Sequence, residues 1–402
     1  MNTLKFAYQF TMSFYPLILI ILAILFNYLT IIQFILGYLA YCIYVQFSTK
    51  TELRYTKTKL NEQILSRCPE LSKPCFKPYF LLPLSVQQML IVAFMKVKNV
   101  NKLKFTKEKV NSYGVNIYWA SIEGEPHPTP DQPILFLMPG MTGCIYDPYV
   151  QNLTMEGLKN GYNVCVYQFR LISKECMLPE NGVFSLHEDI DNALDKIRQK
   201  YRGKIYAVGG SYGANNLIYY LGEKNSKIKK IEAAVSISNP YDMLICERMA
   251  EGTIFETLVT YLEKNNFKNI RKNVEKCKGI DINCDFIANC DEMKAYDEEF
   301  TRKVLGYKSA DDYYRNISAY NKIGDVNIPV LYVSSRDDGM TSSKAIPFDD
   351  IRLNPNSMLL LTDTGAHMCF ISNEKMTEIC QWVTKPVYEF LNANRDLNEK
   401  KL

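Results

Sequence analysis

The sequence predicts an α/β fold in which a mostly parallel central sheet is covered by helices on both faces. Short apolar runs alternate with amphipathic stretches from about residue 110 onward. The runs are rich in Val, Ile, Leu and Tyr, as strands buried on both faces of a parallel sheet are. Helices that connect successive strands produce such an alternation. The predicted strands lie in 133–140, 162–169, 204–210, 231–238, 328–335 and 357–364, and two predicted helices in 185–201 and 375–392.

The N-terminal part of the chain predicts a membrane anchor. Residues 10–47 carry no charged side chain. The run is too long for the apolar core of a signal peptide, and one span needs only about 20 apolar residues. One span with an interfacial helix and two short spans therefore both stay open. The basic residues that follow the run place the main domain on the cytoplasmic or matrix side: Lys50, Arg54, Lys57 and Lys59.

The remaining chain divides into regions by composition. We expect a membrane anchor at 1–50 and a linker with a proline-broken helical extension at 51–110. The α/β domain then occupies 111–395, and a charged tail occupies 396–402. About ninety residues with charged helical faces interrupt the strand–helix alternation. They predict a helical cap inserted at about 240–325.

Bulk composition argues against several functional classes. The net charge of +4 is too small to indicate nucleic-acid binding, and no basic stripe with interleaved aromatic residues is present. The twelve cysteines form no C-x-x-C pair, and the closest group, Cys277, Cys284 and Cys290, has no nearby His. We therefore expect free thiols in a reducing compartment and no zinc site in this group. The mechanism predicted below needs neither a metal nor an organic cofactor. No G-x-G-x-x-G motif follows the first strand, which argues against a dinucleotide-binding oxidoreductase.

Ser211 is the candidate nucleophile. It lies in the sequence GGSYG, between a predicted buried strand and a predicted helix. A tight strand-to-helix turn exposes such a serine, and the glycines at 209 and 213 let the two backbones pass closely. A phosphate-binding loop would require a Lys after its glycines, and none is present.

A serine nucleophile requires a base, and the order of residues along the chain selects His367. The chain has three histidines. His127 and His187 precede Ser211, whereas His367 follows the last predicted strand, as the order Ser, acid, His demands. The acid follows the preceding strand, where two candidates are adjacent. We favour Asp338 from its spacing to the strand end, with Asp337 as the alternative.

An oxyanion hole needs two backbone N–H groups that point at the developing negative charge. One is the N–H of the residue after the nucleophile, Tyr212. The other comes from the loop after the first core strand, which here reads MPGMTG. Gly140 and Gly143 let that loop turn its amides inward, so we expect Met141 to be the second donor.

These segments resemble a membrane-anchored branch of the α/β-hydrolases. That branch contains YheT-like and EMB8-like esterases, medium-chain ethyl-ester synthases and membrane-bound phospholipases. MPGMTG resembles its oxyanion loop, GGSYGANN its elbow, and residues 238–252, 296–318 and 345–370 its cap start, a branch-specific segment and its acid-to-histidine stretch. The resemblance spans about residues 68–392. It implies the α/β-hydrolase fold with a helical cap and an N-terminal transmembrane helix or helical hairpin.

Three positions depart from the pattern of that branch. Leu171 follows Arg170 where the branch has Gly, Ala366 replaces a Gly, and Tyr212 replaces Leu or Met. None of them removes a reacting group, but the Tyr212 side chain is expected to narrow the acyl pocket.

Residues and resemblance together predict a membrane-anchored serine hydrolase of lipid or medium-chain carboxylic esters. The expected partners are an acyl-ester substrate and the bilayer, with other membrane proteins as a further option and no nucleic acid. Acyl length, head group, the acceptor (water or an alcohol) and the choice between endomembrane and mitochondrial membrane stay open. The alternative is a structural or accessory subunit of a membrane complex that has kept the fold without the activity.

Overall fold

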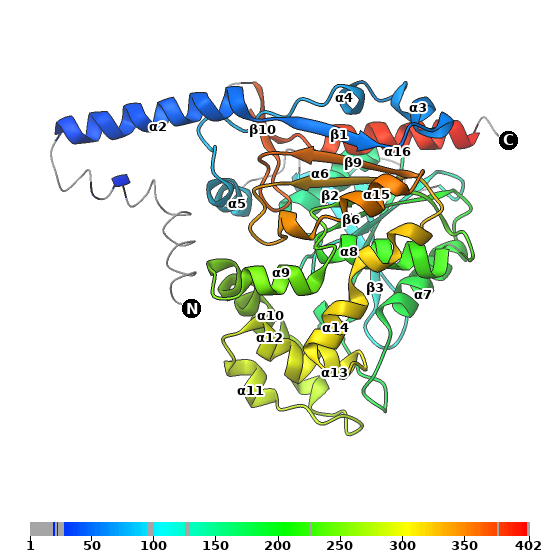
Figure 1. The fold of residues 1–402 in the computed structure, drawn as a ribbon. Helices are drawn as coiled ribbons and strands as arrows, with labels where there is room; N and C mark the ends of the chain where they lie inside the picture. The colour runs from blue at the N-terminus through cyan, green and yellow to red at the C-terminus, as the bar shows by residue number, and fades with distance from the viewer. Residues whose placement is uncertain are drawn as a thin grey trace.

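The computed structural model describes residues 19, 20, 22, 28–94, 100–124, 129–225, 227–375 and 378–399. A nine-stranded sheet with the order β1-β9-β8-β7-β6-β4-β5-β3-β2 forms the centre of the molecule (Figure 1). The six strands from β4 to β9 are parallel, and β1, β2 and β3 are antiparallel to their neighbours. The predicted fold class is therefore confirmed.

The parallel strands occupy the six apolar runs that the sequence predicts as strands. Nearly every residue in them is buried, which explains why the runs are continuously apolar rather than alternating. The carboxyl ends of β6 and β8 thus reach the same edge of the sheet, where loops can bring side chains together. The strands are β4 (Ile134–Met138), β5 (Asn163–Gln168), β6 (Ile205–Gly210), β7 (Ile231–Ile237), β8 (Val330–Ser335) and β9 (Ser357–Thr362).

The expected linker at 51–110 is in fact partly built into the sheet. β1 (Thr51–Tyr55) pairs with β9, and β2 (Leu103–Lys109) pairs with β3 (Asn116–Ile122). Both are edge strands with exposed charged side chains, and β2 reads LKFTKEK. Charges on an edge strand discourage pairing with other chains, and they also make the segment resemble a linker in sequence.

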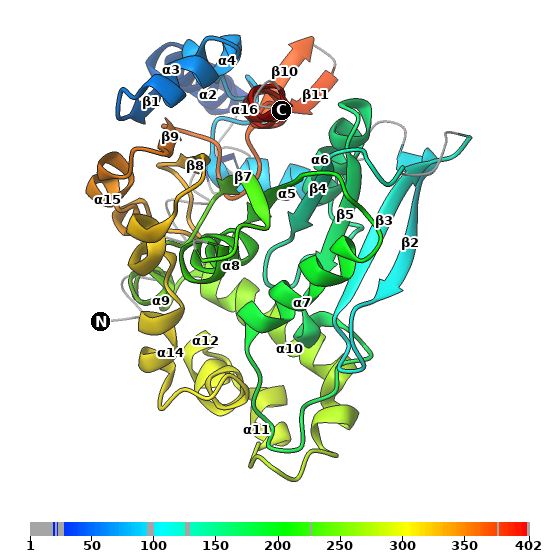
Figure 2. The ribbon, with the colours of Figure 1, turned by 90° about the vertical axis from the view of Figure 1, so that its right-hand side faces the viewer.

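Helices cover both faces of the sheet (Figure 2). On β4, Ile134 and Phe136 contribute to one core cluster, and Leu135 and Leu137 to the other. The first cluster includes side chains of α7, α8 and α15, and the second includes side chains of α3, α4, α6 and α16. These helices are α3 (Lys59–Leu65), α4 (Pro69–Ser72), α6 (Pro148–Lys159), α7 (Leu186–Arg198), α8 (Tyr212–Tyr220), α15 (Phe348–Leu353) and α16 (Thr384–Glu399).

The last predicted helix begins later than expected and also ends later. Residues expected at its start instead form a hairpin of β10 (Ile371–Lys375) and β11 (Glu378–Gln381), so α16 begins at Thr384. The expected charged tail from 396 is also wrong in its first residues, because α16 continues to Glu399. There the Asn398 carbonyl accepts a hydrogen bond from Lys204 Nζ at 3.1 Å, which holds the helix end against the domain.

A helical cap lies between β7 and β8, below the sheet in Figure 1. The buried Asn215 of α8 joins it to the sheet: its side-chain nitrogen donates to the Ile317 carbonyl at 2.7 Å, and its oxygen accepts from the Ala319 N–H at 2.8 Å. The helices of this cap are α9 (Met243–Ala250), α10 (Ile254–Val274), α11 (Cys284–Asn289), α12 (Met293–Tyr296), α13 (Arg302–Val304) and α14 (Ala310–Ile317).

An apolar helix, α2 (Tyr28–Ser48), projects from the body of the domain (Figure 1). Its segment Ile31–Ser48 has a mean hydropathy of 1.5 and is long and apolar enough to cross a membrane. The helix α5 (Ser85–Phe94) comes later in the chain, after β1, α3 and α4, but it lies beside α2: Gln87 Nε2 donates to the Tyr38 hydroxyl at 2.8 Å. Most of the first half of the uncharged run lies outside the described residues, and so does the choice between one span and two.

Candidate active site

Ser211 occupies a strained turn between β6 and α8. Its φ is 54° and its ψ is −124°, a conformation that non-glycine residues rarely adopt. The flanking glycines are required by close backbone contacts. A Cβ at Gly213 would lie 2.2 Å from the Met138 carbonyl oxygen, and one at Gly209 would lie 2.6 Å from Ala214 Cα. The turn therefore raises the Ser211 hydroxyl above the edge of the sheet.

His367 lies directly beside this serine. Its Nε2 is 2.9 Å from Ser211 Oγ, within hydrogen-bonding distance. The loop that carries it is bent sharply, with positive φ values at Ala366 and Met368. Two serines at strand ends hold the bend: Ser335 Oγ donates to the Ala366 carbonyl at 2.9 Å, and Ser238 Oγ accepts from the Met368 N–H at 3.1 Å.

Of the two adjacent acids, Asp338 is the one that contacts the histidine. His367 Nδ1 lies 2.9 Å from Asp338 Oδ2 and 3.2 Å from Oδ1. The Thr341 hydroxyl, 2.7 Å from Oδ2, also donates to this carboxylate, as do the N–H groups of Met340 and Thr341 at 2.9 Å. Asp337 instead accepts a hydrogen bond from the Ala366 N–H at 2.9 Å, on the histidine loop.

The two acids differ in their electrostatic environment. Burial disfavours the charged form of Asp338, but the facing His367 and the Thr341 donors outweigh burial, so the pKa of Asp338 lies below its ordinary value. Burial raises the pKa of Asp337 to about 6, although the Ala366 N–H partly opposes the shift. The carboxyl beside His367 is therefore the one that ionises at the lower pH.

Met141 and Tyr212, the two predicted oxyanion donors, both line the space next to Ser211. Among the described residues, neither N–H group donates a backbone hydrogen bond outside a helix or strand. The Gly140 N–H, by contrast, donates to the Tyr149 hydroxyl at 2.8 Å. A Cβ at Gly140 would lie 3.4 Å from Ser211 Cβ, so the loop passes directly beside the serine.

Ser211 and His367 lie where two cavities meet. The larger, about 230 Å³, is bounded by Met89 and Val92 of α5 and by Val259 and Leu262 of α10. The smaller, about 90 Å³, lies under the cap and is lined by four methionines, which adapt readily to different apolar shapes: Met141, Met243, Met293 and Met340.

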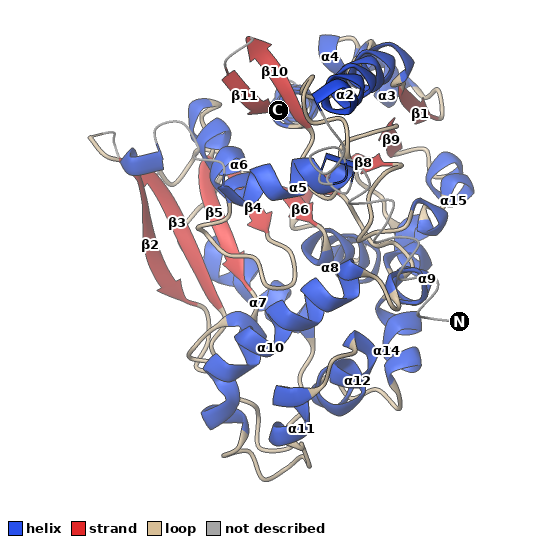
Figure 3. Cartoon of the chain, turned by 90° about the vertical axis from the view of Figure 1, so that its left-hand side faces the viewer, coloured by secondary structure: helices blue, strands red, loops and turns tan. Residues whose placement is uncertain are grey.

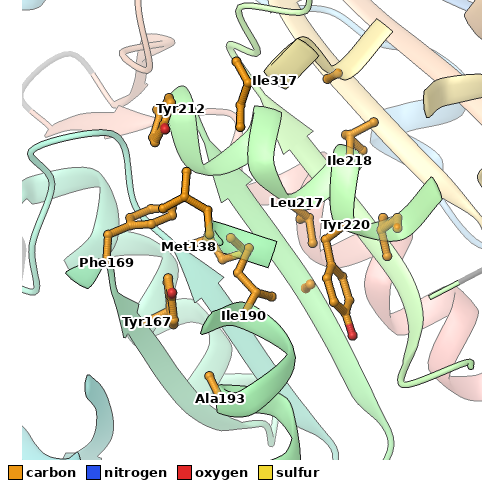
Figure 4. Close-up of a cluster of buried hydrophobic side chains, with 14 of the residues drawn as sticks. Met138, Tyr167, Phe169, Ile190, Ala193, Tyr212, Leu217, Ile218, Tyr220 and Ile317 are labelled. Carbon is orange, nitrogen blue, oxygen red and sulfur yellow. The ribbon is translucent and has the colours of Figure 1, made fainter. Parts of the chain in front are cut away.

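The Tyr212 side chain lines the smaller cavity and is fixed there. Its hydroxyl lies 3.0 Å from the Tyr313 hydroxyl on α14, and its ring packs against Phe169 with centroids 5.6 Å apart. In Figure 4, Tyr212 lies above Phe169, and the α7 side chains Ile190 and Ala193 lie lower in the view. The ring occupies space beside the nucleophile, where the sequence predicts a narrowed pocket.

Comparison with known proteins identifies the family. A profile of the alpha/beta hydrolase fold matches residues 133–374, more than half of the 402 residues. The chain belongs to the α/β-hydrolase fold family.

This α/β-hydrolase is similar to embryogenesis-associated protein EMB8 of Picea glauca, at 28% identity over 65% of this chain and 59% of that protein. It is also 28% identical to phospholipase ABHD3 of Mus musculus, over 65% of this chain and 64% of that one. The chain thus spans less than two thirds of the length of these curated relatives. They belong to the branch that the sequence segments resemble, which confirms the resemblance.

Among solved structures, the chain is similar to Est1E from Butyrivibrio proteoclasticus. The identity is 14% and the TM-score 0.46, over 73% of this chain and 99% of that one.

Of the other two histidines, His187 lies away from the site. His187 lies at the start of α7, where it is buried and stacks on Tyr219 at a centroid distance of 4.2 Å. Burial lowers the pKa of His187 to about 3, so it stays neutral. His127 falls outside the described residues. Within the described part of the chain, no three His, Cys, Asp or Glu side chains are grouped to hold a metal ion.

Sequence reasoning missed two parts of the site. The first is α5, whose Met89 and Val92 line the larger cavity although the segment reads as a proline-broken extension. The second is Glu247 of α9, a buried carboxylate that lines the smaller cavity. Burial raises the pKa of Glu247 to about 7. A glutamate on the apolar face of a predicted cap helix is the only sequence signal that points to it.

Proposed function

We propose that this chain is a membrane-anchored serine hydrolase that cleaves carboxylic esters of lipids or medium-chain acids. The observation that carries the proposal is the continuous contact from Asp338 through His367 to Ser211, with 2.9 Å at each step. A hydroxyl, an imidazole and a carboxylate in this order form the machinery of acyl transfer through a covalent acyl-enzyme.

Each residue then has a defined role. His367 Nε2 removes the proton from Ser211 Oγ as that oxygen attacks the acyl carbonyl carbon. Asp338 holds the Nδ1–H tautomer and stabilises the imidazolium that forms. His367 then returns the proton to the leaving alkoxide, which departs as the alcohol. Water, or another alcohol in a transfer reaction, attacks the acyl-enzyme by the same proton movements in reverse and frees Ser211.

The tetrahedral intermediate carries a negative oxygen that needs donors in place beforehand. The N–H groups of Met141 and Tyr212 are suited to this role, because they flank Ser211 and no other described backbone group outside helices and strands competes for them. Preorganised donors of this kind contribute about 3–4 kcal/mol each to transition-state stabilisation. No metal or organic cofactor takes part in this mechanism.

An acyl ester of lipid type suits the surroundings of the serine. Met, Val and Leu make up nearly half of the residues that line the larger cavity. The smaller cavity combines four methionines with aromatic side chains and with the acidic residues Glu247, Glu256 and Asp297. ABHD3 is described as a phospholipase, which places this substrate class among the relatives. The apolar helix α2 would hold the domain at a bilayer, and the basic residues after it favour the cytoplasmic or matrix side. The cap would exclude water from the acyl-enzyme.

Labelling by a fluorophosphonate probe tests the proposal. The full chain in mild detergent should react covalently, and Ser211→Ala should abolish the reaction. Ser72→Ala, on the exposed surface of α4, is the matched control and should label as the wild type does. A folded wild type that fails to label would favour an accessory subunit, and co-migration with other membrane proteins would then identify its complex.

A further inference from the structure

Two helices that border the larger cavity carry apolar side chains on their outer surfaces. On α5, Met89 and Val92 line the cavity, whereas Leu90 is 55% exposed on the outside. On α10, Val259 lines the cavity, whereas Leu258 is 40% exposed and Tyr261 is 58% exposed. Large apolar side chains exposed around a cavity mouth indicate an interaction surface rather than an ordinary water-facing one.

The parts of α5 and α10 that border the mouth of the larger cavity contain no exposed charged residue. The segment 78–95 has no Asp, Glu, Lys or Arg, and Lys77 and Lys96 flank it. On α10, residues 257–262 are also uncharged, and the preceding Glu256 is buried. Its carboxylate accepts a hydrogen bond from the Gly252 N–H at 2.6 Å and so serves the helix start.

The apolar helix α2 relates this surface to a membrane. α2 is fixed to the α5 region by contacts at both ends of its interface: the Tyr38 hydroxyl donates to the Leu81 carbonyl at 3.0 Å, and Gln46 Nε2 donates to the Pro78 carbonyl at 2.6 Å. Figure 3 looks nearly along α2 and shows α5 and α10 on the side of the domain from which α2 projects. A bilayer that contains α2 therefore meets the domain on that side.

We propose that α5 and α10 form a docking face that rests on the bilayer, with Leu90, Leu258 and Tyr261 in contact with lipid. This inference rests on the proposed function and names the route of its substrate. An ester lipid moves from the leaflet between α5 and α10 into the larger cavity and reaches Ser211 without crossing water. Tyr261 suits the interfacial region, where amphipathic aromatic rings are enriched, and the two leucines suit the acyl boundary beneath it.

A direct contact measurement tests the docking face whether or not the protein is an esterase. Tyr261→Trp in the full chain is reconstituted into phosphatidylcholine vesicles with brominated acyl chains. This variant should fluoresce more strongly than the wild type, whose two tryptophans are buried. The brominated lipids should quench that extra fluorescence by at least about half. Leu353→Trp is the matched control, because Leu353 is 73% exposed on α15, away from both helices. Equal quenching at both positions, or none at 261, overturns the proposal.

Turnover measurements test the route. Leu90→Asp combined with Leu258→Asp should lower hydrolysis of a vesicle-embedded ester about tenfold or more, because charged side chains replace apolar contact with lipid. Hydrolysis of a water-soluble p-nitrophenyl ester in detergent should change less than about twofold, since neither residue lines the cavity. Leu353→Asp should change neither rate. Equal losses on both substrates, or no loss on vesicles, contradict the route.

A second copy of the chain is the competing occupant of this face. The mass of the protein in detergent, measured by light scattering, separates the two. A dimer that the paired aspartate substitutions convert to a monomer would assign the face to self-association and overturn the proposal. A monomer in both cases, together with quenching at 261, supports contact with lipid. Quenching without any esterase turnover would support the docking face and contradict the proposed function.

Discussion

Asp337 and Ala366 are joined by a hydrogen bond of 2.9 Å from the Ala366 N–H to the Asp337 carboxylate. This bond connects the two loops that present Asp338 and His367, one residue beyond it in each case. Asp337 is thus a positioning residue: it holds the distance between the loops, whereas Asp338 contacts the imidazole itself.

Replacing each acid by its amide separates the two roles. Asp338→Asn should lower kcat about 10³- to 10⁴-fold, because the amide cannot maintain the required tautomer or stabilise the imidazolium. Asp337→Asn should change kcat less than about threefold at pH 8, because the amide oxygen still accepts from Ala366. Turnover of a p-nitrophenyl ester by the two purified variants checks this, and equal losses would refute the division of roles.

The strained backbone of Ser211 predicts a gain in stability when the serine is removed. Ser211→Gly should raise Tm by about 2 °C, because glycine adopts a positive φ without the cost of about 1 kcal/mol or more that other residues carry. Ser211→Ala loses the same hydroxyl but keeps the Cβ, so it is the matched control and should show a smaller gain. Differential scanning calorimetry of both variants in detergent compares them. Identical Tm values would mean that the turn stores no measurable strain.

The buried Glu247 predicts a pH-dependent stability. Burial raises its pKa to about 7 from an ordinary 4.5, so its contribution to stability is fully present below pH 4.5 and is lost as pH rises through 7. Glu247→Gln should therefore raise Tm by about 1–2 °C relative to the wild type at pH 8 and leave it nearly unchanged at pH 4.5. Thermal unfolding at both pH values measures this. A difference that does not depend on pH would show that Glu247 titrates normally.

The sequence predicts the interior of the sheet well and its edges poorly. The six parallel strands are apolar throughout because both faces are buried, so composition alone marks them. β1 and β2 are missed because an edge strand needs charged side chains on its open face. β3 is missed as well, although it pairs with β2 on one side and β5 on the other. The hairpin β10–β11 is missed because its residues, ISNEK and EICQ, are as polar as the first turn of a surface helix.

The candidate site is predictable to the extent that chain order decides it. Ser211 and His367 follow from a motif and from the position of one histidine among three. Asp337 and Asp338 are indistinguishable in sequence, because their roles depend on the geometry of a single turn. The contribution of α5 to the cavity wall depends on a contact between distant segments: Met89 and Val92 pack against the loop of Ala366 and Cys369. No local sequence pattern predicts such a contact.

The junction between α2 and β1 has a mechanical consequence. Only Thr49 and Lys50 separate the end of the apolar helix from a strand of the central sheet. Hydrogen bonds in both directions between Lys50 and Asp363 clamp this connection to the end of β9. If α2 spans a bilayer, as proposed, a domain mounted so stiffly would have a fixed height and tilt above that bilayer, unlike a domain on a flexible tether. The active site would then reach only lipids of the leaflet beneath the domain, and not those of a facing membrane.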